Sequence, residues 1–418
     1  MSAVIPTADD DSLRGGRYRK RMPFDVASVR GRFPSLGDGS IHFDAQAGMQ
    51  VPASVASATA AGLRRLPVTA GGVSPQALAA AEAEQNARRA VADLLDADPA
   101  GVVLGLNRYA LVTALVDALP ISIWAGDVVC SRLDDEDNIV PWLRAVRTYG
   151  AQLRWAEVDI TNGTLPVSQF LDVITERTKI VAVTLASSAL GSITDLAPIA
   201  AQAHAVGALL VVDASAAAPY VRLSIDELGA DVVLVSPQRW GGPRMAAMVF
   251  ADPDRIAALR AVSLDPRVTG PARLEIEPLA GLLLTGLSAS IDYLADLDAA
   301  AAGKRRQRLS TSMDSVFDYL QRLTAYLVNS LTQLSRVHVI GPDVHRVPAV
   351  SFTVDGLPAE QVCRRLAGNG ISALHGVPSR ALAHIGVDEV GGAVTVGLGP
   401  YAVPYEVDQL ARVLGSFG

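Results

Sequence analysis

The strongest constraint on the fold is a series of short apolar segments that alternate with amphipathic ones between residues 102 and 250. The segment Ile180 to Val183 is apolar at every position, which is typical of a strand buried on both faces of a sheet. We therefore predict an α/β fold with a large, doubly wound, mostly parallel sheet between layers of helices. The predicted strands are Val102 to Leu104, Asp127 to Ser131, Gln152 to Ala156, Ile180 to Leu185, Leu209 to Asp213, Val232 to Ser236 and Met245 to Phe250.

The chain is long enough for a second domain, since half of its 418 residues are apolar. We expect an N-terminal arm and segment at residues 1–45, a large domain at 46–285 and a small C-terminal α+β domain at 286–418. Residues 1 to about 22 end in a basic run and are expected to be a disordered or loosely docked arm, with a nucleic-acid-binding arm as the less favoured alternative. Other predicted elements are a helix from Pro75 to Leu95, strands Val337 to Ile340, Val350 to Val354, Ile371 to Leu374 and Val394 to Leu398, and helices Pro358 to Ala367 and Pro404 to Ser416.

Charge and cysteine content narrow the function classes. The formal net charge of −7 disfavours binding to nucleic acid or to an anionic membrane. No run of about 18 apolar residues is long enough to span a membrane, so we expect a cytoplasmic protein. Cys130 and Cys363 are too few for a disulfide framework, and no metal site is expected. The acidic run Asp134 to Asn138 precedes a helix and is explained by capping and by pairing with the helix macrodipole, with a divalent metal site as the less favoured alternative.

Several polar residues follow predicted strands, where ligands bind in sheets of this kind. Asp213 ends an apolar strand, so its carboxylate can either pair with a positively charged ligand nitrogen or cap the next turn. Asn107 and Arg108 open a helix after a strand, which is either an anion site or an ordinary strand-to-helix turn. Arg239 lies in the irregular segment from Ser236 to Pro243 and either grips a carboxylate or phosphate or is solvated at the surface.

These segments together resemble the class V aminotransferases, which are pyridoxal-phosphate enzymes of fold type I, and in particular their cysteine-desulfurase-like branch. The resemblance runs from about Phe24 to the end of the chain and implies a homodimer with its cofactor cleft at the subunit interface. It places Asn107, Arg108, Asp135, Ser188, Asp213 and Ser236 around the cofactor. The stretches that carry it are Phe43 to Gly48, Arg132 to Ile139, Ala186 to Gly191, Val211 to Ala214 and Ser236 to Pro243.

The sequence departs from the family pattern at the positions that carry its chemistry. Family members form a Schiff base between a lysine and the cofactor, and that lysine corresponds to Arg239, whose guanidinium is neither a nucleophile nor a base. The residue expected to stack on the cofactor ring, usually His, is Asp135, whose charge would repel a phosphate or carboxylate. The chain has three lysines, Lys20, Lys179 and Lys304, and none lies in a predicted site loop. Further departures are Thr395 for a substrate-binding arginine, Tyr401 to Val403 for Tyr-Asn-Thr, Glu277 and Pro278 for a phosphate-binding Gly-Thr, and the lack of a cysteine near Leu374 to Gly376.

From these departures we expect a homologue that has lost Schiff-base chemistry and acts as a binding or regulatory protein, or by chemistry without a lysine-bound cofactor. The alternative is an active pyridoxal-phosphate-dependent transferase or lyase, of aminotransferase or desulfurase type, that holds the cofactor noncovalently. The resemblance implies pyridoxal phosphate without covalent attachment, or no cofactor. An anionic small molecule is the expected ligand, near Asn107, Arg108, Asp213, Ser236 and Arg239.

Overall fold

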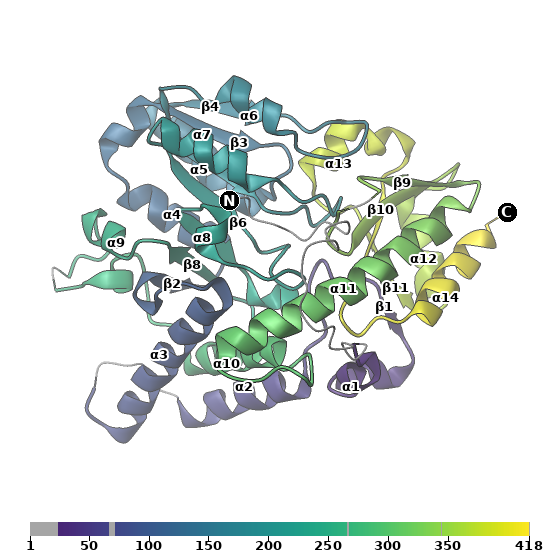
Figure 1. Cartoon of the computed structure of the whole chain (residues 1–418), viewed down its shortest axis with the longest axis horizontal. Coiled ribbons are helices and arrows are strands. Elements are labelled where there is room, and N and C mark those ends of the chain that lie inside the picture. Colours follow the sequence, from purple (N-terminus) through teal and green to yellow (C-terminus); the bar gives the residue numbers. More distant parts are fainter. Residues whose placement is uncertain (1–23, 67–71, 266, 344, 418) are drawn as a thin grey trace, which may run out of the picture.

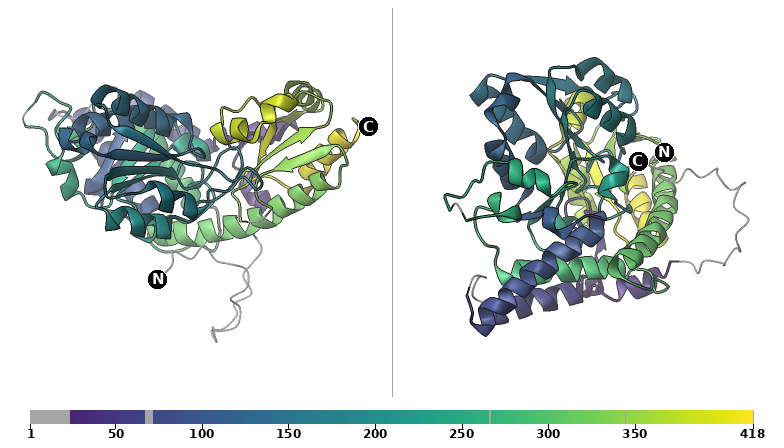
Figure 2. Two further views of the ribbon diagram at one scale, coloured as in Figure 1. Left: turned by 90° about the horizontal axis from the view of Figure 1, so that it is seen from above. Right: turned by 60° about the vertical axis from the view of Figure 1, so that its left-hand side comes forward.

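The computed structural model describes residues 24–66, 72–265, 267–343 and 345–417. The arm predicted at residues 1 to about 22 lies outside these residues. Within them, the chain forms two sheet-based bodies that are joined along one side by a long helix, α11 (Arg305–Thr332), shown in green in Figure 2. One end of α11 packs on helices of the large body, and the other packs on the small one.

The large body, which contains β2, β3, β4, β6 and β8 as labelled in Figure 1, is built on a seven-stranded sheet in the order β2-β8-β7-β6-β5-β3-β4. Strand β8 is antiparallel to β2 and β7, and the other neighbouring pairs are parallel. The predicted doubly wound, mostly parallel sheet is therefore confirmed. The strands are β2 (Val102–Gly105), β3 (Asp127–Ser131), β4 (Gln152–Ala156), β5 (Thr178–Thr184), β6 (Leu209–Asp213), β7 (Val232–Val235) and β8 (Ala246–Phe250).

Both faces of this sheet are buried, because successive apolar side chains point to opposite sides. On β5, Val181 packs in one core and its neighbours Ile180 and Ala182 pack in the other. Helices α4 and α5 supply the second core, and α3, α7 and α10 contribute to the first. The helices of this body are α2 (Ala53–Arg65), α3 (Pro75–Leu95), α4 (Arg108–Ala118), α5 (Glu136–Tyr149), α6 (Val167–Val173), α7 (Leu196–Ala205), α8 (Ile225–Leu228), α9 (Asp254–Ala258) and α10 (Gly281–Ala295), with short 3-10 turns at Pro99–Gly101, Ile121–Ala125, Pro237–Trp240 (η4) and Gly270–Arg273.

The small body is an antiparallel sheet in the order β12-β13-β10-β9 with helices on one side. The N-terminal segment belongs to this body structurally, since β1 pairs with β11 in a separate two-stranded sheet. The expected division between domains at residue 286 falls inside α10. The elements are α1 (Val26–Arg30), η1 (Pro34–Asp38), β1 (Ile41–His42), β9 (Val337–Ile340), β10 (Ala349–Val354), α12 (Ala359–Ala367), β11 (Ile371–Ser372), β12 (Leu374–His375), α13 (Arg380–Ile385), η6 (Val387–Val390), β13 (Val394–Gly397) and α14 (Pro404–Gly415).

One predicted strand is wrong. Residues 371–374 were expected to form a single strand, but the structure divides them between β11 and β12. The two short strands pair with different partners, β1 and β13, and so belong to different sheets. Pairing with β1 depends on a segment more than 300 residues away in sequence, which a local apolar pattern cannot reveal.

Among the described residues, no helix combines the length and the apolar character needed to cross a membrane.

Candidate functional site

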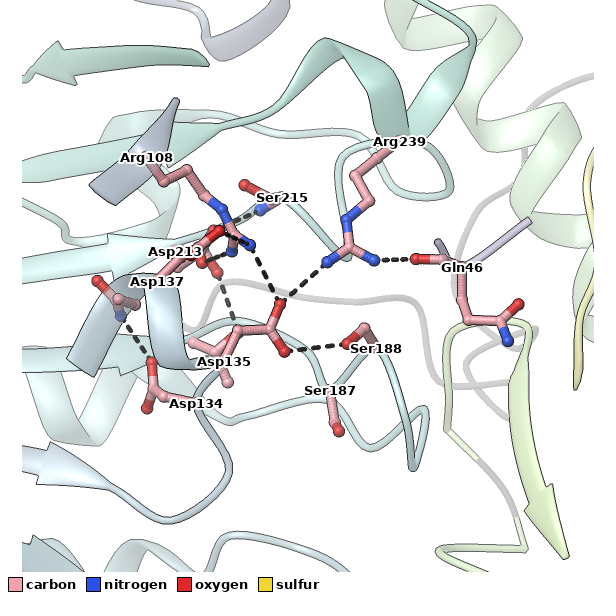
Figure 3. A network of polar contacts seen from close by, with 12 residues as sticks. Gln46, Arg108, Asp134, Asp135, Asp137, Ser187, Ser188, Asp213, Ser215 and Arg239 are labelled. Atoms are coloured by element: carbon pink, nitrogen blue, oxygen red, sulfur yellow. Dashed lines mark hydrogen bonds and ion pairs between the residues drawn. The ribbon is translucent and has the colours of Figure 1, made fainter. Parts of the chain in front are cut away.

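The predicted site residues gather at the carboxyl edge of the large sheet. Strands β2, β3, β5, β6 and β7 all run in the same direction and end at this edge. Asp213 ends β6, the segments that follow the other strands carry Arg108, Asp135, Ser188 and Arg239, and Figure 3 shows these side chains turned toward one another. The expectation that ligand-competent side chains meet at this edge agrees with the geometry of parallel sheets.

Arg108 is a buried cation at the start of α4. Its guanidinium donates to the Asp213 carboxylate and lies 3.3 Å from both Asp135 Oδ2 and Asp137 Oδ2. Burial alone would lower the pKa of Arg108, but the surrounding carboxylates, with Asp213 first among them, outweigh burial and raise it. The neighbouring Asn107 caps the helix, since its side-chain oxygen accepts from Ala110 N at 2.8 Å. The guanidinium of Arg108 is therefore already paired with carboxylates of the protein.

Asp213 is buried at the end of β6, as predicted, but it is not available to a ligand nitrogen. One carboxylate oxygen accepts from Arg108. The other accepts from the backbone N–H of Ser215 at 2.9 Å. The turn-capping interpretation agrees with the contact to Ser215, and the cation that Asp213 pairs with is a residue of the chain.

Arg239 lies in η4, directly after β7, and is not a solvated surface residue. Its side chain is only 11% exposed. One terminal nitrogen donates to Asp135 Oδ2 at 3.0 Å, and the other donates to the backbone carbonyl of Gln46. Ser236 supports this turn, because its carbonyl accepts from Arg239 N at 3.0 Å. The guanidinium is thus held between the large body and the N-terminal segment.

Asp135 is the centre of the network. Its Oδ2 faces the guanidiniums of Arg108 and Arg239, and its Oδ1 accepts from Ser188 Oγ at 3.0 Å. Burial would raise the pKa of Asp135, but the two guanidiniums and the hydroxyl lower it below its usual value. The capping interpretation is wrong for this side chain. Asp135 occupies the N-cap position of α5 without making a side-chain cap hydrogen bond, because its carboxylate is drawn to the cations instead.

Asp134 is a second buried acid that the sequence analysis did not separate from its neighbours. Its carboxylate accepts from Ser131 Oγ and from Asn138 Nδ2, the latter at 2.6 Å. Burial raises its pKa to about 7, against the lowering effect of these hydrogen bonds. Gln46 and Asp137 were also missed as members of the network. Gln46 contributes through its backbone carbonyl, which no sequence motif records.

A cleft of about 420 Å³ lies over the network, between the carboxyl edge of the large sheet and the segment 374–378 of the small body. Its lining includes the cations Arg108 and Arg239 and the acids Asp135, Glu136 and Asp137. Since each guanidinium already has a carboxylate partner, the cleft offers no excess positive charge to an anion. Among the described residues, no group of three metal-ligating side chains is found.

Comparison with known proteins decides the family. Residues 41–410 match the family model described as aminotransferase class-V. The chain belongs to the aminotransferase class-V family. The structural resemblance inferred from the sequence, including the cysteine-desulfurase-like branch, is confirmed by relatives and neighbours of that kind.

Three of these similar proteins cover nearly the whole chain. An uncharacterized protein of Mycobacterium tuberculosis (strain CDC 1551 / Oshkosh) is 51% identical over 95% of this chain and 100% of its own length. A probable cysteine desulfurase of Streptomyces coelicolor is 28% identical over 83% of this chain and 86% of its own length. The apo structure of a cysteine desulfurase from Thermococcus onnurineus NA1 superposes with a TM-score of 0.82 and 23% identity, covering 94% of this chain and 97% of that one.

The cofactor of this class V family, pyridoxal phosphate, does not fit the residues present. The loop position expected to carry the Schiff-base lysine holds Arg239, which is fixed by Asp135 and Gln46. Asp213 is engaged by Arg108, so it is not free to receive a pyridine nitrogen. Of the described lysines, Lys179 lies near the opposite end of β5 from this edge and Lys304 precedes α11.

Proposed function

We propose that this chain is a non-catalytic member of the class V family that acts by binding, without a lysine-linked cofactor. The observation that carries the proposal is the position of Arg239, whose guanidinium is locked between Asp135 Oδ2 and the Gln46 carbonyl at the place where the family needs a free amine. An arginine in a protein stays protonated, so it supplies neither the nucleophile nor the base.

The ion-pair network supports the proposal beyond a single substitution. Arg108 neutralises Asp213, and Asp135 bridges Arg108 to Arg239. Each of the two guanidiniums therefore has a carboxylate partner within the chain, and neither needs a ligand to balance its charge. The alternative, an active transferase or lyase with noncovalent pyridoxal phosphate, would have to break the Arg108–Asp213 pair before Asp213 could face the ring.

Under this proposal, an anionic ligand is not expected to bind directly to Arg108 and Arg239. The carboxylate of Asp135 already provides the anion between Arg108 and Arg239, so an external anion at these residues must displace it. A ligand in the cleft is then expected to bind through neutral polar groups of its own, or at the rim of the cleft. Neither nucleic acid nor a membrane forms part of the proposal.

The experiment compares the native protein with Arg239→Lys in the presence of pyridoxal phosphate, by visible absorbance and by retention after dialysis. The proposal expects both proteins to stay colourless, because the altered pocket rejects the ring even when an amine is restored. A coloured, retained complex in the native protein would contradict it. Colour in Arg239→Lys alone would show that only the lysine is missing and would contradict the proposed remodelling of the pocket.

We also propose a homodimer in the cytoplasm. The two cysteines are free and buried, as in proteins of reducing compartments. Leu106, which follows the edge strand β2, is 48% exposed, and Ile276, which follows Glu275 in the chain, is 76% exposed. We propose that these two exposed apolar side chains belong to the interface. Light scattering of the native protein should give twice the chain mass, and Ile276→Glu should give the monomer; a monomeric native protein would contradict the proposal.

A further inference from the structure

A second cleft adjoins the first on the side of the small body. It measures about 590 Å³, a size typical of small-molecule sites. The two clefts share Glu136 and the segment 376–378. The large body contributes Arg132, which directly follows β3, and the small body contributes Arg380 at the start of α13. This cleft therefore also lies at the carboxyl edge of the sheet.

The two arginines stack on the same indole. The guanidinium carbon of Arg132 lies 4.2 Å from the ring centroid of Trp155, and that of Arg380 lies 4.9 Å from it. The two guanidiniums are consequently no more than about 9 Å apart. Trp155 belongs to β4, the edge strand of the sheet. An aromatic surface thus holds two cations from different bodies of the protein in one place.

Of the two arginines, Arg132 has an ion-pair partner and Arg380 has none among the described residues. Nε of Arg132 pairs with Glu157 at 3.3 Å, and His384 lies 3.7 Å from the same carboxylate. Arg132 makes this contact through Nε, and within the described residues its terminal nitrogens have no hydrogen-bond partner. For Arg380, the described part of the chain provides no ion-pair partner. Glu136 and Asp388 also line the cleft, but neither is paired with these two arginines.

We propose that this second cleft binds a small organic anion. Its carboxylate or phosphate oxygens are held by Arg380 and by the terminal nitrogens of Arg132, because planar guanidiniums recognise such oxygens by paired hydrogen bonds. Its apolar part packs against Val377 and Leu382, which also line the cleft. The site is separate from the Asp135 network, so it does not depend on the function proposed above.

Calorimetric titration with phenyl phosphate and with benzoate tests the proposal, with phenol as the uncharged control. We expect saturable binding of at least one anion and none of phenol, and the comparison of the two anions shows whether phosphate or carboxylate is preferred. Arg380→Gln and Arg132→Gln should each weaken binding by at least about tenfold, since each removes charge-assisted hydrogen bonds. Raising the salt concentration should weaken binding in the same direction.

Arg365→Gln is the matched control, because Arg365 also stacks on an aromatic ring, 4.7 Å from the centroid of Phe417, but lies outside the cleft. It should bind the anion like the native protein. Arg380→Lys keeps the charge without the planar fork, should retain part of the affinity, and takes the place of Arg380→Gln if that variant does not fold. The proposal is overturned if neither anion binds the native protein saturably, or if the folded variants of Arg380 and Arg132 bind as tightly as the control.

Discussion

Arg239 Nη2 lies 3.0 Å from Asp135 Oδ2, so the residue at the expected lysine position is paired with the residue at the expected ring-stacking position. Two departures from the family pattern are thereby explained as one arrangement. A carboxylate at residue 135 would be unfavourable beside a bound phosphate, but it is favourable between Arg239 and Arg108. The charges of Arg239 and Asp135 compensate each other in this arrangement.

Removing the central carboxylate should destabilise the protein. We expect Asp135→Asn to lower the free energy of unfolding by about 1–3 kcal/mol, because it leaves Arg108 and Arg239 with less compensation in a largely buried site. Urea denaturation at neutral pH measures this difference. Since the native pKa of Asp135 is lowered, its contribution is present above the unfolded pKa near 4 and is lost as the pH falls through the lowered value.

Asp137→Asn is the control for this change. Asp137 also lies 3.3 Å from Arg108, but its side chain is 54% exposed, so the free energy of unfolding should change by less than about 0.5 kcal/mol. Equal effects of the two substitutions would show that Asp135 has no special position in the network.

Asp134 should make the protein less stable as the pH rises. Its folded pKa of about 7 exceeds the unfolded value near 4, so the folded state binds the extra proton between these values. The stabilising contribution of Asp134 is fully present below about pH 4 and is lost progressively as the pH rises to about 7. Asp134→Asn removes the titration and should raise the unfolding free energy at pH 8, relative to the native protein, by a few kcal/mol.

Unfolding of both proteins at pH 5 and pH 8 measures the effect. The difference between native protein and Asp134→Asn should grow with pH. A difference that is constant across this range would contradict a raised pKa at residue 134.

Arg346 should be essential to the contact between the two bodies. It is 2% exposed and donates to the carbonyls of Leu190 at 2.6 Å and Ala349 at 3.0 Å, which belong to different bodies. Burial lowers its pKa to about 10. Arg346→Gln leaves buried carbonyls without donors and should lower the unfolding free energy by about 3 kcal/mol or more in urea denaturation.

Arg336→Gln provides the comparison for Arg346. Arg336 also donates to carbonyl oxygens, those of Asp355 and Phe417, but it is only half-buried. Water can replace its hydrogen bonds, so we expect a loss of under about 1 kcal/mol. A cost for Arg346→Gln no larger than this would show that residue 346 does not hold the bodies together.

The sheet of the large body could be predicted because its signal is local. The ends of β3, β4 and β6 fall at the residues expected from the sequence, and in β3 and β6 they are given by an apolar run next to a polar residue. The meeting of Asp213, Arg108 and Arg239 follows from the same pattern, since parallel strands present their carboxyl ends at one edge.

The pairing of charges at that edge could not be predicted in the same way. Arg108 and Asp213 are 105 positions apart, and Arg239 and Asp135 are 104 apart. Spacing in the chain does not say which guanidinium meets which carboxylate. Asp134 and Asp135 are adjacent in one acidic run, yet one has a raised pKa and the other a lowered one, because only Asp135 faces the cations.

The most direct test of the central claim is incubation of the native protein with pyridoxal phosphate, followed by borohydride reduction, intact mass measurement and peptide mapping of Lys20, Lys179 and Lys304. The account predicts no stoichiometric adduct and a protein that returns to its unmodified mass. A one-to-one adduct on any of these lysines would contradict it.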